Sequence, residues 1–159
     1  MSGDGIAPYR FVVPRDWCDY NRHLNDGYFL VAFSTAADVV LEAVGLGAGY
    51  RACGEFSAYT VDAHVRYRKE GKAGDALAIE QEILDYDARR LLVAQEMKRG
   101  AELLAACECL YVHVDTRGPK AAPFPPEIFR RIAALKAACD ARAGISPAPV
   151  PGALLQARR

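Results

Sequence analysis

The sequence predicts an α+β fold in which one antiparallel sheet wraps around one long buried helix, with a second helix on the surface near the C-terminus. Three observations predict it. Residues 28–46 form a long apolar run that fits a buried helix. Four later segments have the pattern of β-strands, and in the first two, residues 56–68 and 76–86, apolar residues recur on one side with a period of two. Residues 126–142 place apolar side chains on a single helical face.

The first strand is predicted over Arg10–Trp17, interrupted by Pro14. The buried helix is then predicted from Gly27 to about Val44, with Asp26 as its N-cap or Asn25 as the alternative. The glycine cluster at 45–49 ends it. The polar side chains of this helix form one narrow stripe: Ser34, Asp38 and Glu42. Because a single curved sheet cannot surround such a helix, we expect a second subunit to cover the rest.

These four segments are 56–68, 76–86, 91–99 and 102–115, and they are predicted to be consecutive, meander-like strands. In the first segment, one face is apolar: Tyr59, Val61, Ala63, Val65 and Tyr67. The other face is polar: Thr60, Asp62, His64, Arg66 and Arg68. Residues 69–75 are predicted to form a turn, and 116–126 a proline-rich irregular segment.

Composition favours a single soluble domain, predicted over residues 1–143, followed by a flexible tail at 144–159. Hydrophobic residues make up 52% of the 159 residues. Lys+Arg and Asp+Glu are 20 each, so the net charge of zero argues against a nucleic-acid or anionic-membrane partner.

The cysteines and the N-terminus favour the cytoplasm. There are 5 cysteines without a CxxC spacing, and Cys107 and Cys109 share one strand face as small core residues. The N-terminal residues lack a signal-peptide pattern, and we find no charge-free membrane span. No metal site or redox cofactor is predicted.

The loop at 17–28, with the sequence WCDYNRHLNDGY, holds the predicted site. It brings an acid, an imidazole and two carboxamides to the start of a buried helix, where polar groups are costly unless they are hydrogen-bonded or used. A helix N-terminus offers free backbone N–H groups and the positive end of a dipole. A carboxylate beside it could attack a carbonyl, or direct water at one, while those N–H groups hold the carbonyl oxygen.

Asp19, His23, Asn25 and Tyr28 in this loop resemble the signature of the 4-hydroxybenzoyl-CoA thioesterase-like branch of the hot-dog fold. The segment HVRYRKEGKAGDALAIEQEI also resembles that branch, and the resemblance covers roughly residues 9 to 140. It departs at Arg22, where the branch usually has glycine. The run DYNRHLNDGYFLVAFSTAAD is similar to bacterial thioesterases of carnitine breakdown that act on betainyl-CoA.

The resemblance implies hydrolysis of an acyl-CoA to a carboxylate and CoA. Asp19 would be the nucleophile or the general base, and these two roles stay open. His23 would polarise the thioester oxygen through its own or a neighbouring backbone N–H, or orient Asp19; a structural histidine is the alternative. Asn25 would position water, or simply cap the helix.

The remaining candidates are substrate-binding residues. Aromatic side chains could form a cage for a trimethylammonium group, with packing as the alternative reading: Trp17, Tyr20, Tyr28, Tyr59 and Phe33. His64 could reach the site from a partner subunit, or be a solvated histidine. A basic cluster around the 69–75 turn could bind CoA phosphates, or be solvated: Arg66, Arg68, Lys69 and Lys72.

We therefore predict an acyl-CoA thioesterase, working as a homodimer or a dimer of dimers, with its site at the dimer interface. Asp19 and His23 would come from one chain and His64 or Tyr59 from the other. Glu42 is predicted to be paired or solvent-facing. The alternatives are hydration or dehydration of a hydroxyacyl thioester, which would recruit His64, and a non-catalytic acyl-CoA sensor.

Overall fold

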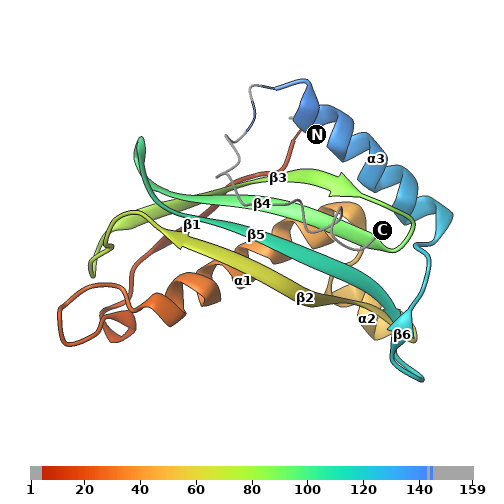
Figure 1. Ribbon diagram of the computed structural model, residues 1–159, viewed down its shortest axis with the longest axis horizontal. Coiled ribbons are helices and arrows are strands. Elements are labelled where there is room, and N and C mark those ends of the chain that lie inside the picture. The colour runs from red at the N-terminus through yellow and green to blue at the C-terminus, as the bar shows by residue number, and fades with distance from the viewer. Residues whose placement is uncertain (1–4, 143, 145–159) are drawn as a thin grey trace.

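A curled antiparallel sheet surrounds one side of a long central helix in the computed structural model, which describes residues 5–142 and 144 (Figure 1). The helices are α1 (Asp26–Val44), α2 (Ala48–Cys53) and α3 (Pro126–Asp140), with a 3-10 turn at Arg15–Trp17. The strands are β1 (Tyr9–Val12), β2 (Phe56–Tyr67), β3 (Ala76–Tyr86), β4 (Arg90–Arg99), β5 (Glu102–Asp115) and β6 (Lys120–Ala121). Apart from Gly144, the predicted tail lies outside the described residues.

The strand order is β1-β3-β4-β5-β2, with β6 on β5, and every pairing is antiparallel. The β3–β4–β5 part is a meander, as predicted. The prediction that β2 joins this meander beside β3 is wrong, because β2 pairs with the far side of β5. A period of two identifies a strand but carries no information about its neighbour, and β4 already occupies the inner side of both β3 and β5. The 69–75 segment therefore connects opposite halves of the sheet.

The first strand is shorter than predicted, because β1 ends at Val12 and the chain turns into the 3-10 segment after Pro14. Proline has no N–H for a strand ladder, so it stops the strand instead of interrupting it. Helix α2 was not predicted. The bounds of α1, β3, β4 and β5 agree with the predictions within one residue, and α3 ends two residues earlier than predicted.

Helix α1 lies against the inner face of the sheet, and Phe33, Ala36 and Val40 are fully buried there. Two buried glutamines fix its position. The Gln95 Nε2 atom donates to the Phe33 carbonyl at 2.9 Å and to Gln81 Oε1 at 3.0 Å, and Gln81 Nε2 donates to the Ala36 carbonyl at 2.8 Å. Such satisfied polar groups in a core specify one arrangement of helix and sheet.

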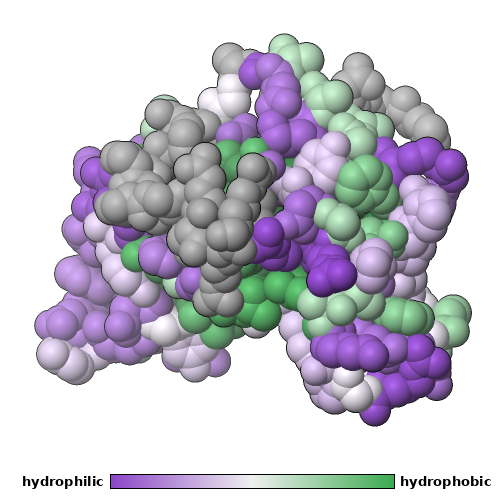
Figure 2. Space-filling model, turned by 45° about the vertical axis from the view of Figure 1, so that its right-hand side comes forward, coloured by the Kyte–Doolittle hydropathy of each residue, from purple (hydrophilic) through white to green (hydrophobic). Residues whose placement is uncertain are grey.

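The opposite side of α1 is uncovered in this chain, where Leu30 and Val31 are 43% and 44% exposed. By length and composition α1 could cross a membrane, but the core helix of a soluble protein passes the same test. Apolar side chains also reach the surface elsewhere, and Figure 2 shows an apolar area near the centre of one face, bordered by polar side chains.

Candidate active site

A tight turn at residues 19–23 presents the Asp19 carboxylate. Its Oδ1 accepts hydrogen bonds from the backbone N–H groups of Asn21 at 2.8 Å and His23 at 3.3 Å. The Asp19 N–H donates to the His23 carbonyl, and the Arg22 N–H to the Asp19 carbonyl, both at 2.9 Å. Both of these bonds go to Oδ1, so Oδ2 accepts no hydrogen bond from the described residues.

Arg22 keeps the backbone geometry of a glycine, since its φ is +63°. It is the one described non-glycine residue with a positive φ. The departure from the family pattern therefore changes the side chain but not the turn, and the left-handed conformation is strained for arginine.

The turn is braced against the connection between β2 and β3. The Leu24 N–H donates to the Gly71 carbonyl at 2.8 Å, and His23 forms an isolated β-bridge with Lys72. A Cβ on Gly71 would lie 3.3 Å from the Leu24 Cβ, so glycine allows this close approach. The site loop thus depends on the segment that joins the two halves of the sheet.

The start of α1 leaves one backbone donor without a protein partner among the described residues. Asn25 caps the helix, accepting from the Gly27 N–H at 2.9 Å through its side chain and from the Tyr28 N–H through its carbonyl. The N–H of His23 is already bonded to Asp19. No hydrogen bond from the Asp26 N–H is found within residues 5–142 and 144, so this group is the candidate to hold a carbonyl oxygen.

Asp19 and Asp26 open onto the same cavity of about 420 Å³. Its lining residues also include His23, Leu24, Phe29, Tyr67, Arg68, Lys69 and Glu70. Tyr67, from the end of β2, closes one wall: its hydroxyl donates to the Asp26 carbonyl at 3.1 Å, and its ring packs perpendicular to Phe29 with centroids 5.3 Å apart. Burial, and then the Asp26 carboxylate, raise the pKa of Tyr67. Sequence reasoning placed Asp26 and Tyr67 only as a cap and a buried strand residue.

The predicted aromatic cage is not assembled in this chain. Trp17 and Tyr28 stack on each other, with centroids 5.1 Å and planes 17° apart, and Phe33 is fully buried in the core. Tyr20 is 94% exposed at the loop tip. Trp17 and Tyr28 are outside the lining of the Asp19 cavity.

Tyr59, His64 and Arg66 lie on the outer face of β2, away from α1. A bulge between Thr60 and Asp62 reverses the alternation, so Tyr59 shares a face with His64 and not with Tyr67. The prediction that Tyr59 and Val61 continue the inner face is therefore wrong. His64 Nε2 lies 3.5 Å from Asp62 Oδ1. Within one chain these residues and Asp19 are not brought together.

The basic cluster is partly committed to ion pairs, since Lys69 Nζ lies 2.6 Å from Glu102 Oε1. Arg68 remains directed at the cavity that Asp19 lines. Glu42 accepts a hydrogen bond from the Ala48 N–H at 2.9 Å and so caps α2, which agrees with the prediction of a paired carboxylate.

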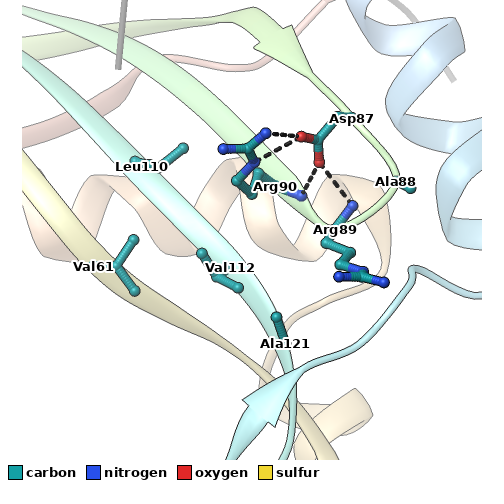
Figure 3. Close-up of a pocket in the computed structure, with 8 residues that line it drawn as sticks. All are labelled: Val61, Asp87, Ala88, Arg89, Arg90, Leu110, Val112 and Ala121. Carbon is teal, nitrogen blue, oxygen red and sulfur yellow. Dashed lines mark hydrogen bonds and ion pairs between the residues drawn. The ribbon is translucent and has the colours of Figure 1, made fainter. Parts of the chain in front are cut away.

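A second cavity, of about 580 Å³, lies where the ends of β4 and β5 meet β2 (Figure 3). Asp87 is the acid on its rim, and it is committed to Arg90 and to the backbone of Arg89. Burial would raise the pKa of Asp87, but these hydrogen bonds lower it. None of the predicted catalytic residues lines this cavity. In the described part of the chain, no cluster of three or more His, Cys, Asp or Glu could hold a metal ion.

The curled sheet, the central helix and the acid-bearing loop at its start define a hot-dog thioesterase. A model of the thioesterase-like superfamily matches residues 12–132, and this chain belongs to that family. A betainyl-CoA thioesterase from Pseudomonas aeruginosa is 32% identical over 132 residues, covering 82% of this chain and 83% of that protein. The predicted fold and enzyme class, a soluble hot-dog thioesterase for acyl-CoA, are confirmed.

Two further proteins similar to this chain also carry the name thioesterase. The structure of a putative thioesterase from Pseudomonas putida KT2440 is 32% identical, with a TM-score of 0.75 over 91% of this chain and 94% of that chain. An L-carnitine dehydrogenase/betainyl-CoA thioesterase from Agrobacterium fabrum is 38% identical over 122 residues. This chain spans 76% of its own length but only 25% of that longer relative.

Proposed function

We propose that this chain hydrolyses betainyl-CoA, or a closely related short acyl-CoA, to the carboxylate and free CoA. The observation that carries the proposal is that Asp19 and Asp26, whose backbone N–H has no partner among the described residues, line one cavity. A thioester carbonyl lying between them would have its oxygen held by the helix N-terminus and its carbon facing the acid.

Two routes fit this arrangement. In the first, an Asp19 oxygen bonds to the carbonyl carbon, the carbon–sulfur bond breaks, and CoA leaves as a thiolate before water hydrolyses the mixed anhydride. In the second, Asp19 takes a proton from water as that water attacks the same carbon. His23 supports either route by donating its backbone N–H to Asp19, which holds the carboxylate in place.

The substrate proposal rests on relatives that are named betainyl-CoA thioesterases. Arg68 would meet a phosphate of CoA at the mouth of the cavity. The reaction is proposed to need no metal or redox cofactor, and to take place in the cytoplasm.

A homodimer, or a dimer of dimers, is part of the proposal. The uncovered side of α1, with Leu30 and Val31, and the open edge of β2 are surfaces that a second copy would bury. Tyr59 or His64 of the second copy would then complete the site. Light scattering after size exclusion measures the mass of the assembly.

Release of CoA thiol from a panel of short-chain, aromatic and betainyl thioesters tests the function, with wild type and Asp19→Asn. The asparagine keeps an oxygen for the turn but cannot act as nucleophile or base, so we expect kcat to fall about 100-fold or more. Asp16→Asn, at an exposed acid of the preceding 3-10 turn, is the matched control. Binding of thioesters by wild type without turnover would refute the proposal and favour a sensor.

A further inference from the structure

The acyl group of the proposed substrate places its charge beside the reacting carbon. In a betainyl thioester, one methylene separates the carbonyl carbon from the quaternary nitrogen. Whatever recognises this cation must therefore lie on the cavity that holds Asp19. Acids further along α1 are too distant: Asp38 follows Asp26 by 12 residues, which is about 18 Å of helix.

We infer that Asp26 and Tyr67 select for a cationic acyl group, in place of the aromatic cage suggested by the sequence. This inference rests on the proposed thioesterase function. Both residues line the Asp19 cavity, and both are exposed to it. An aromatic face and a carboxylate are the two groups that attract a quaternary ammonium ion, which cannot donate a hydrogen bond.

Tyr67 is held ready for this role by contacts at both ends of its ring. Its hydroxyl is bonded to the Asp26 carbonyl and its ring is packed on Phe29, yet 51% of the residue remains exposed. The ring therefore needs no rearrangement to receive a ligand, which reduces the cost of binding.

Asp26 supplies the negative charge at the same place. Its backbone N–H is the proposed donor to the thioester oxygen. The carboxylate belongs to the same residue, so it would lie close to the bound carbonyl group. Within residues 5–142 and 144, its carboxylate forms no ion pair. Of the two cations on the cavity wall, Lys69 is paired with Glu102, and the proposed function assigns Arg68 to a phosphate of CoA.

The test compares betainyl-CoA with 3,3-dimethylbutyryl-CoA, whose carbon replaces the quaternary nitrogen and keeps its shape. We expect wild type to have the higher kcat/KM for betainyl-CoA. Tyr67→Leu should lower the ratio of the two kcat/KM values roughly three- to thirtyfold, and Asp26→Asn should lower it at least about threefold. Tyr67→Phe keeps the ring and should restore most of the ratio. Asp38→Asn, at an exposed acid of the same helix, should leave the ratio unchanged.

A second readout separates this inference from the proposed function. In the Asp19→Asn background, the Kd of each thioester is measured without turnover, and the same Kd preference for the cation is expected. Cation preference in Kd without hydrolysis by wild type would refute the thioesterase proposal and support the inference. Hydrolysis with equal kcat/KM for both thioesters, or a ratio that Tyr67→Leu and Asp26→Asn leave unchanged, would overturn the inference.

Discussion

Replacing Arg22 by glycine should stabilise the protein, although it removes a long side chain from the site loop. The residue has a φ of +63° and is exposed. A left-handed conformation costs a non-glycine residue about 1–2 kcal/mol. Glycine offsets about 0.5–1 kcal/mol of this gain, because it loses more backbone entropy on folding. The net gain in the free energy of unfolding is therefore about 0.5–1 kcal/mol, which raises Tm by about 1–4 °C for a domain of this size.

Urea denaturation of wild type, Arg22→Gly and Arg22→Ala measures this gain. Alanine removes the guanidinium but keeps the backbone strain, so Arg22→Ala should stay within about 0.5 kcal/mol of wild type. Only Arg22→Gly should have a larger free energy of unfolding than wild type and Arg22→Ala. If Arg22→Gly is no more stable than Arg22→Ala, then the loop does not hold this residue in a strained conformation, and the reasoning is refuted.

Two other predictions concern the core and the surface. Gln95→Leu should lower the free energy of unfolding, measured by urea denaturation, by about 1–3 kcal/mol, because it leaves the buried Gln81 Oε1 without its donor. The Gln81→Leu/Gln95→Leu double variant should lose less stability than the sum of the two single variants. Arg117 holds the pKa of Asp115 at about 2, below its ordinary 3.8. This carboxylate thus contributes stability above pH 3.8 that is lost as the pH falls towards 2. The stability difference between wild type and Asp115→Asn should shrink over that window, and a constant difference would contradict the pairing.

Local patterns predicted the elements well because their causes are local. Helix α1 follows from its apolar run and its glycine stop, although the predicted cap Asp26 is wrong and the alternative, Asn25, caps the helix. Strands β3 and β5 follow from their strand-like residue patterns, although β3 carries a bulge between Ile83 and Asp85. The bulge at Val61 could not be predicted in the same way. Thr60, Val61 and Asp62 all fit a regular strand. One extra residue moves the side chains of the preceding part of β2 to the opposite face of the sheet. That single residue separates Tyr59 from the inner face where the sequence placed it.

The loop motif predicted the acid of the site but not the residues around it, for a topological reason. Asp19 and the α1 N-terminus are neighbours in sequence, so their proximity follows from the chain itself. Tyr67 reaches them only because β2 pairs with the far edge of β5. The segment after β2 then lies against the site loop, where the Gly71 carbonyl accepts a hydrogen bond from Leu24. No periodicity in β2 carries that information.

The uncovered side of α1 ties the proposed dimer to the proposed chemistry. Leu30 and Val31 lie about one helical turn from Asp26, which lines the cavity. A second copy that buries this apolar stripe would also cover the open mouth of the cavity and exclude water from it. Charges act more strongly where water is excluded, so the same burial that stabilises a dimer would strengthen the hold of Asp26 on a cationic acyl group. An apolar surface one turn from a charged site is costly for a lone chain, and becomes useful when two chains share it.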